Sequence, residues 1–160
     1  MIQIGFCDDD LSILSELRVL LDRYRVERNV EIASAAFQSP LELLTEIERG
    51  TRFDILLLDI EMGGMDGVTM AKRLRQSNDT VQIIFITGYS DYIAEGYEVA
   101  ALHYLVKPLD ENKLFSVLDR AAEKLQKNEK VLHLELSGEM VRLPVHRIRW
   151  AEVSGNYVTI

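Results

Sequence analysis

Five polar residues stand at the ends of four apolar runs in this sequence, and their side chains could act together. The residues are Asp8, Asp9, Asp59, Thr87 and Lys107, and the runs cover residues 2–7, 53–59, 81–87 and 102–106. Runs rich in Ile, Leu, Val and Phe are typical of buried strands. If the strands are parallel, their carboxyl ends meet at one edge of a sheet, where α/β proteins bind ligands. We therefore expect three carboxylates, a hydroxyl and an ammonium group to converge at that edge.

This combination of groups suits the transfer of a phosphoryl group to a carboxylate. Carboxylates that lie close together repel one another, so some of their pKa values should rise unless a cation is present. Oxygen ligands of high charge suit Mg²⁺, and a lysine and a threonine could donate hydrogen bonds to phosphoryl oxygens. Taken singly, each residue also has a plain structural role: Asp59 could cap a turn, Thr87 could fill a strand end and Lys107 could be a solvated charge.

The elements that must position these side chains alternate between strand and helix. A weaker strand is predicted over residues 31–37, in addition to the four runs. Helices are predicted from Leu11 onward, over 40–49, around 68–74, over 90–101 and over about 111–127. Helix-length connections between consecutive strands predict a parallel, doubly wound, five-stranded sheet with right-handed crossovers.

The composition argues against general affinity for nucleic acid. The 160 residues include 26 Asp or Glu and 18 Lys or Arg, a formal net charge of -8. Such a chain repels phosphate backbones, although a local basic patch could still exist. Cys7 is the only cysteine, so no intrachain disulfide can form and a reducing compartment is expected. Because neither a signal peptide nor a membrane-length apolar run is recognisable, the expected location is the cytoplasm.

Residues 1 to about 126 resemble the receiver domain of two-component response regulators. The matching strings are CDDD, LLLDIEMGGMDG, FITGY and YLVKP, in the family's order and at suitable spacing. The resemblance implies a flavodoxin-like fold with Asp59 as the phosphoacceptor. It also implies that Asp9, Asp59 and the backbone carbonyl of Glu61 hold Mg²⁺, with Asp8 acting largely through metal-bound water.

The same resemblance implies roles for residues around the phosphoryl group. Thr87 and Lys107 would hold its oxygens, and Tyr104 would be the aromatic side chain that rotates on activation. The bond between Lys107 and Pro108 would be cis. Two further positions tune, in the family, the rate at which water removes the phosphoryl group; they are Glu61 and Tyr89.

From Val131 the apolar pattern changes to a period of two, which is typical of short antiparallel strands. We expect a receiver domain over residues 1–126, a charged linker over 127–130 and a second unit over 131–160. The string LHLELSGEMVRLPVHRIRWAEVSGNYVTI resembles the beginning of a LytTR-type DNA-binding domain. It stops before the segments through which that family reads DNA, so we expect a truncated domain that binds no specific DNA site. Its unpaired strands would either stay poorly ordered or pair with another copy of the chain.

Three functions are compatible with these patterns. The first is a response regulator: a sensor histidine kinase phosphorylates Asp59, and the altered receiver surface controls DNA binding by the complete C-terminal domain, with or without homodimer formation. The second is a haloacid dehalogenase-type phosphatase, because residues 8–12 loosely echo its paired-aspartate motif. The chain lacks room for that family's cap, however. The third is a receiver-like interaction module that is not phosphorylated, although the complete set of pocket residues argues against it. We favour the first function, that of a signalling switch rather than an enzyme.

Overall fold

The computed structural model describes residues 1–78, 80–88, 99–129, 131–136, 139–144, 152–154 and 157–159, with side chains described as far as residue 127. The chain divides into two compact units, Met1–Asp119 and Arg120–Ile160. Three predictions fall largely or wholly outside the described residues: the helix over 90–101, the role of Tyr89 and the part of the period-two pattern over 145–151.

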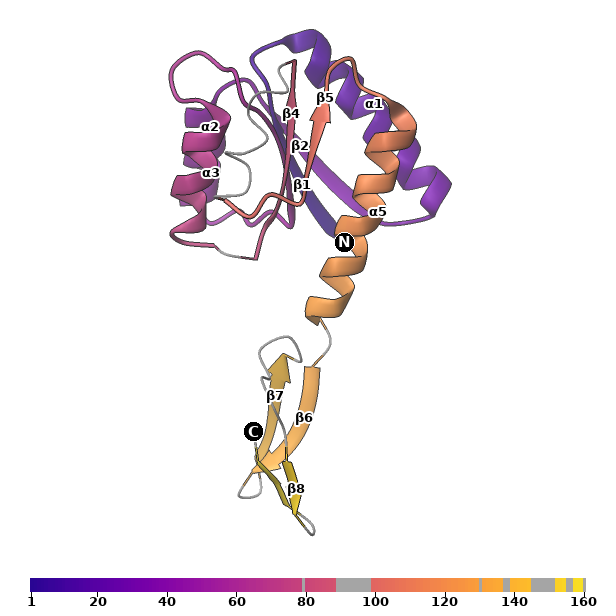
Figure 1. Cartoon of the computed structure of the whole chain (residues 1–160), viewed down its shortest axis with the longest axis vertical. Helices are drawn as coiled ribbons and strands as arrows, with labels where there is room; N and C mark the ends of the chain where they lie inside the picture. The colour runs from indigo at the N-terminus through magenta and orange to yellow at the C-terminus, as the bar shows by residue number, and fades with distance from the viewer. Residues whose placement is uncertain are drawn as a thin grey trace. The chain divides into compact units, whose positions relative to one another are not determined.

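The first unit is built on a five-stranded parallel sheet with the strand order β2-β1-β3-β4-β5 (Figure 1). Its strands are β1 (Ile2–Cys7), β2 (Ile32–Phe37), β3 (Ile55–Asp59), β4 (Gln82–Thr87) and β5 (His103–Val106). All five residues of β3 are buried, because β1 and β4 flank it on both sides within the sheet and helices cover its faces. The strand order confirms the doubly wound, flavodoxin-like fold that the sequence predicts.

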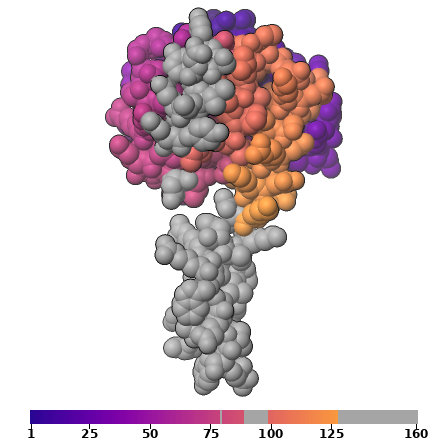
Figure 2. Space-filling model, in the orientation of Figure 1, coloured from indigo at the N-terminus to yellow at the C-terminus, as the bar shows by residue number. Residues whose placement is uncertain are grey.

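Helices cover both faces of this sheet. They are α1 (Leu11–Arg28), α2 (Pro40–Glu48), α3 (Gly67–Arg75) and α5 (Glu111–Glu129), with α1 and α5 on one face and α2 and α3 on the other (Figure 1). The space-filling view has magenta atoms of α2 and α3 toward one side and orange atoms of α5 toward the other (Figure 2). Between the layers, large side chains such as Phe6, Leu21, Leu43, Phe85 and Leu118 are almost completely buried. Their burial is the main source of stability for this unit.

The helices that follow β1, β2 and β3 begin at side chains that cap them. The Asp10 carboxylate accepts a hydrogen bond from the backbone N–H of Ser12 at 2.9 Å. The Ser39 hydroxyl caps α2 and the Asp66 carboxylate caps α3 in the same way. Capping satisfies backbone donors that the first turn leaves unpaired. Within the acidic triplet after β1, the helix therefore uses Asp10, which leaves Asp8 and Asp9 for another role.

Helix α5 is longer than its sequence pattern indicates. It continues to Glu129, so residues 127–129, for which the sequence predicts a linker, are helical. The string KNEK contains no apolar residue that would indicate a helix, yet Lys and Glu are good helix formers without one. None of the helices within the described ranges has an apolar stretch sufficient to cross a bilayer.

The second unit contains two short antiparallel pairs. Strand β6 (Val131–Leu136) pairs with β7 (Glu139–Pro144), and β8 (Glu152–Ser154) pairs with β9 (Tyr157–Thr159). This arrangement confirms the all-β character predicted for residues 131–160, as far as they are described.

Candidate functional site

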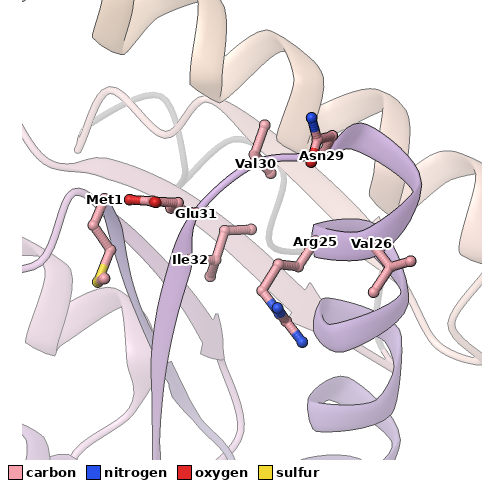
Figure 3. Close-up of a pocket in the computed structure, with 7 residues that line it drawn as sticks. All are labelled: Met1, Arg25, Val26, Asn29, Val30, Glu31 and Ile32. Atoms are coloured by element: carbon pink, nitrogen blue, oxygen red, sulfur yellow. The ribbon is translucent and has the colours of Figure 1, made fainter.

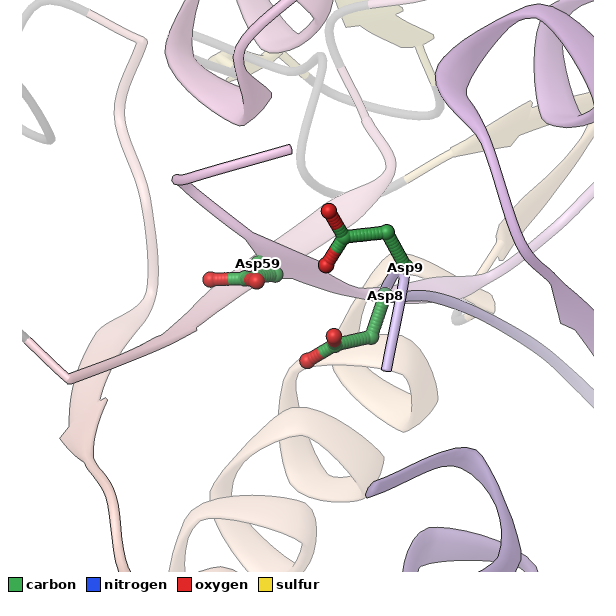
Figure 4. Close-up of side chains that lie close together, drawn as sticks. All are labelled: Asp8, Asp9 and Asp59. Atoms are coloured by element: carbon green, nitrogen blue, oxygen red, sulfur yellow. The ribbon is translucent and has the colours of Figure 1, made fainter. Parts of the chain in front are cut away.

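Three carboxylates meet at the carboxyl edge of the sheet (Figure 4). Asp8 and Asp9 follow β1, and Asp59 is the last residue of β3; one oxygen from each lies within 4.8 Å of the others. The neighbouring positions of β1 and β3 in the sheet bring these residues together. Asp8 and Asp59 are buried, at 2% and 5% exposure, whereas Asp9 is exposed. The cluster thus has a buried floor of two acids and a third acid at its opening.

An ammonium group lies against the two buried acids. Lys107 follows β5, and its Nζ lies 2.8 Å from Oδ2 of Asp8 and 3.3 Å from Oδ2 of Asp59. Its backbone N–H donates to the carbonyl oxygen of Thr87 at 2.7 Å, which fixes the start of this loop to the end of β4. The next peptide bond, between Lys107 and Pro108, is cis.

Burial and charge compete in setting the protonation of this cluster. Burial, reinforced by the charge of Asp8, raises the pKa of Asp59 to about 6, although Lys107 and the backbone N–H of Glu61 act in the opposite direction. Burial by itself would lower the pKa of Lys107, but the hydrogen bond to Asp8 and the charges of Asp59 and Asp8 raise it overall. At neutral pH the site therefore contains an ionised Asp59 beside a protonated Lys107.

Local backbone contacts orient the two buried carboxylates. Oδ1 of Asp8 accepts a hydrogen bond from the backbone N–H of Asp10 at 2.8 Å. Oδ1 of Asp59 accepts one from the backbone N–H of Glu61 at 3.3 Å. In both cases the donor lies two residues further along the chain, as in an Asx turn. The second oxygen of each acid therefore faces Lys107.

Thr87 and Tyr104 lie on the neighbouring strands. Thr87 is completely buried at the end of β4. The residue before it, Ile86, pairs with Asp59 of β3 in the sheet. Tyr104 is half-buried, and its ring centroid lies 6.0 Å from that of Phe85. Phe85 and Thr87 share one face of β4 because alternate residues of a strand do. Phe85 is a further residue of this site, and its alternation with Thr87 along β4 is the sequence signal that indicates it.

The donor set of the cluster fits a hard divalent cation. It consists of carboxylate oxygens alone, and three carboxylates face one ammonium group, so the site carries excess negative charge. Cys7 does not belong to it, because its Sγ lies 3.5 Å from Sδ of Met62 in the core. Burial raises the pKa of the Cys7 thiol to about 12, and the neighbouring carboxylates add to this effect. The thiol therefore stays protonated.

An open pocket lies at the opposite edge of the sheet, at the amino ends of β1 and β2 (Figure 3). It is lined by Met1, Arg25, Val26, Asn29, Val30, Glu31 and Ile32. Its lining has one acidic and one basic side chain, Glu31 and Arg25. It contains none of the five polar residues that the sequence places at the carboxyl ends of strands. The chemistry of this unit therefore concentrates at the carboxyl edge, away from the pocket.

Comparison with known proteins agrees with this geometry. Residues 4–119 match the family model of the response regulator receiver domain. The sensory transduction protein LytT of Bacillus cereus is 30% identical over 150 residues, which cover 92% of this chain and 58% of that protein. The transcriptional regulator NtrC of Escherichia coli K12 is 31% identical over 133 residues, 82% of this chain and 27% of that protein. The chain thus spans little more than half of the first relative and about a quarter of the second.

Solved structures share the fold at lower identity. The response regulatory domain of protein mrkE from Klebsiella pneumoniae superposes with a TM-score of 0.71 at 22% identity, covering 79% of this chain and 99% of that one. The BeF3-activated receiver domain of DrrB gives a TM-score of 0.66 at 22% identity, covering 77% and 98%. These similarities support the fold described above.

Proposed function

This chain belongs to the response regulator receiver family, and from this membership we propose that Asp59 accepts a phosphoryl group from the phosphohistidine of a sensor histidine kinase. One observation carries the proposal: the Asp59 carboxylate is buried at a strand end, 3.3 Å from the Lys107 ammonium and beside Asp8 and Asp9. Because the chain belongs to this family, we prefer the receiver function to that of a haloacid dehalogenase-type phosphatase. Receivers are signalling switches rather than conventional enzymes.

The transfer needs little covalent chemistry from the protein. An oxygen of Asp59 attacks phosphorus, the new P–O bond forms as the P–N bond breaks, and the released imidazole keeps the electron pair of that bond and takes up a proton. Because the pKa of Asp59 is about 6, the carboxylate is ionised and nucleophilic at neutral pH. Lys107 and the Thr87 hydroxyl are in place to donate to oxygens of the phosphoryl group. Catalysis of this kind rests on positioning and charge neutralisation.

The excess negative charge of the cluster favours a Mg²⁺ cofactor. Asp9, Asp59 and the backbone carbonyl of Glu61 would hold Mg²⁺, with Asp8 acting through its bound water, and the ion would supply positive charge opposite the phosphoryl oxygens. Lys107 offers only one positive charge to the acids, so it does not replace the ion. Glu61 and Tyr89 remain candidates for tuning the rate of hydrolysis.

Phosphorylation then alters the surface around β5 and α5. The added negative charge draws the Thr87 hydroxyl toward Asp59. This movement leaves space on the face of β4 that carries Thr87. Tyr104, whose ring packs against Phe85 on that strand, rotates into the space. This change alters how the receiver contacts its partners, including a second receiver in a homodimer.

We assign the output to a LytTR-type DNA-binding domain that begins within residues 131–160. The period-two pattern, two antiparallel pairs and the similarity to LytT support this assignment. The receiver then extends over residues 1–126, residues 127–130 connect the parts, and the whole protein acts on transcription in the cytoplasm. Binding to a specific DNA site would be carried out by that LytTR-type domain.

The test is phosphorylation by a small donor. Acetyl phosphate with Mg²⁺ should add one phosphoryl group to the folded chain, and borohydride trapping followed by mass spectrometry should locate it on Asp59. Asp59→Asn is the control and should remain unlabelled. A label on Asp8 would contradict the assignment of the acceptor. An unlabelled wild-type chain would instead support the unphosphorylated interaction module.

A further inference from the structure

We propose that Gly67 is a positioning residue for Asp59, because only a residue without a side chain lets the start of α3 lie directly against the main chain of the phosphoacceptor. The inference rests on the proposed function, since it concerns the reactivity of Asp59. It adds a residue outside the acidic cluster to the set that determines the rate of phosphorylation.

The contact between Gly67 and β3 involves backbone on both sides. A Cβ at position 67 would collide with the carbonyl oxygen of Asp59 and would lie 3.0 Å from its carbonyl carbon and 3.1 Å from Cα of Ile60. A flexible side chain could turn away from such a collision, but these atoms belong to the main chain at the end of β3. Any side chain at position 67 must therefore displace Asp59, α3 or both.

Position 67 requires glycine for space rather than for backbone conformation. Among the glycines described, Gly50 and Gly64 have a positive φ and Gly67 does not. The backbone N–H of Gly67 donates to the carbonyl oxygen of Ile60 at 2.9 Å, which closes the loop over residues 61–66. The Asp66 cap on Thr69 fixes the first turn of α3 at the same point. The helix start is therefore held tightly against the residue that follows Asp59.

The functional groups of the site leave little tolerance for a shift of Asp59. Its carboxylate lies 3.3 Å from Nζ of Lys107 and accepts a hydrogen bond from the backbone of Glu61, within the loop that Gly67 closes. A misplacement of about 1 Å in a reacting group can reduce a rate roughly 10²-fold. Relieving the collision at position 67 requires a movement of about this size, since nonbonded carbon atoms prefer separations of about 3.5–4.0 Å.

The same loop provides a matched control. A Cβ added at position 63 would have no neighbouring heavy atom within 4 Å, and the φ of Gly63 is not positive. Gly63→Ala therefore adds the same methyl group four residues away without a collision. Asp66→Ala is a second control, because it removes the cap of α3 and costs about 1 kcal/mol of stability without placing an atom against Asp59.

The experiment measures the rate of phosphorylation by acetyl phosphate at saturating donor and Mg²⁺, together with the concentrations that give half the maximal rate. Gly67→Ala should lower the saturated rate at least about tenfold, whereas Gly63→Ala and Asp66→Ala should stay within about twofold of wild type once rates are corrected for the folded fraction. Circular dichroism and thermal melts give that fraction. If Gly67→Ala is partly unfolded, all four proteins are compared at low temperature with a stabilising osmolyte.

The outcomes separate this inference from the proposed function. A wild-type chain that is not labelled contradicts the proposed function. A wild-type chain that is labelled, with Gly67→Ala reacting at a similar saturated rate, overturns the role of Gly67 alone. Equal losses in Gly63→Ala or Asp66→Ala would also overturn it, because the effect would then come from loosening the loop or the helix. Failure of Gly67→Ala to fold even with the osmolyte would make Gly67 a requirement of the fold and not of the site.

Discussion

Asp59 is the residue at which burial and reactivity conflict. A buried carboxylate is harder to ionise, and Asp8 adds a like charge, yet the proposed reaction needs the ionised form. The Lys107 ammonium, 3.3 Å away, partly offsets both effects. This balance has a measurable consequence for stability.

In metal-free protein, Asp59→Asn should raise the free energy of unfolding above about pH 6, by about 1–3 kcal/mol. The folded-state pKa is about 6 and the ordinary value is 3.8, so the folded state binds more protons than the unfolded state between these values. The contribution of Asp59 to stability therefore falls as pH rises through this window and is constant above it. Urea unfolding of both proteins in EDTA, from about pH 5 to pH 8, measures the difference. Asp22→Asn, at an exposed site on α1, is the control, and a pH-independent difference for Asp59→Asn would contradict the prediction.

Asp9 and Asp10 are adjacent acids with different surroundings, and Mg²⁺ should distinguish them. Mg²⁺ should stabilise the wild-type chain by about 2.7 kcal/mol at a concentration 100 times its Kd, because it binds only the folded state. Asp9→Ala should lose most of this gain. Asp10→Asn should keep it, since Asp10 caps α1 and Asn is also a good cap. Thermal melts with and without Mg²⁺ measure the gain, and equal shifts in Asp9→Ala and wild type would remove Asp9 from the ligand set.

At the scale of the elements, α1 and α5 are joined by a network around one acid. Oδ1 of Asp119 accepts from the hydroxyl of Tyr24 at 2.8 Å and from Nε of Arg28 at 3.1 Å. The ring of Tyr24 is buried and meets Phe115 edge-on, at a centroid distance of 5.2 Å. Burial and Asp119 raise the pKa of Tyr24, so its hydroxyl remains a donor.

Asp119→Ala should reduce the free energy of unfolding by about 1–3 kcal/mol, because it removes the acceptor of the Tyr24 hydroxyl. In a Tyr24→Phe background the same change should cost about 0–1 kcal/mol, since only an exposed ion pair with Arg28 is then lost. Urea unfolding of the four proteins gives the coupling. Glu111→Ala, which breaks the exposed pair with Arg23 between the same helices, should also cost little. Additive effects of the Tyr24 and Asp119 changes would contradict this account.

Arg75, at the end of α3, joins the connection that leads into β4 to the segment that leads into β5. Its guanidinium donates to the carbonyl oxygens of Val99 at 2.7 Å and Val81 at 2.6 Å, with longer bonds to those of Asn78 and Ala100. Ala100 has a positive φ of 51°. The guanidinium thus supports a backbone turn that alanine rarely adopts.

Arg75→Ala should lower the free energy of unfolding by about 1.5–3 kcal/mol, as expected for hydrogen bonds from a charged donor. Arg75→Lys should restore less than half, because an ammonium group cannot reach separated carbonyls at once. Hydrogen exchange at Leu102, whose N–H donates to Ile83 at the entry to β5, should accelerate in both variants. Arg73→Ala, at an exposed position of the same helix, is the control, and full rescue by lysine would contradict the multidentate role.

At the scale of the whole chain, the two units have unequal sheets. The first has a five-stranded sheet with a buried centre, whereas the described residues of the second form two pairs of strands, in which each strand has one partner. Isolated two-stranded pairs are marginally stable. Amides of β6 and β7 should therefore exchange with solvent faster than those of β1 and β3.

Hydrogen exchange followed by mass spectrometry on these peptides measures the difference. If β6 to β9 pair with a second copy of the chain, their protection should rise with protein concentration while that of β1 and β3 stays constant. Equal protection of both units in dilute, monomeric protein would contradict the prediction.

Much of this molecule could be predicted from local patterns in the chain. Apolar runs that end in Asp or Thr, alternating with helical periodicity, determine a parallel sheet and the edge at which polar side chains gather. The change to a period of two at Val131 determines antiparallel strands. A short window of sequence is enough to predict these features, because they depend on which neighbouring residues are buried.

The tertiary structure decided which group touches which. The sequence contains three successive acids after β1, but only the fold shows that Asp8 contacts Lys107, Asp10 caps the start of α1 and Asp9 lies at the opening of the cluster. The collision that Gly67 avoids depends on how closely α3 approaches β3, and the bond between Tyr24 and Asp119 depends on how α5 lies beside α1. Such distances are determined by strand register, sheet twist and layer packing, which join residues far apart in the chain and leave no local periodicity to read.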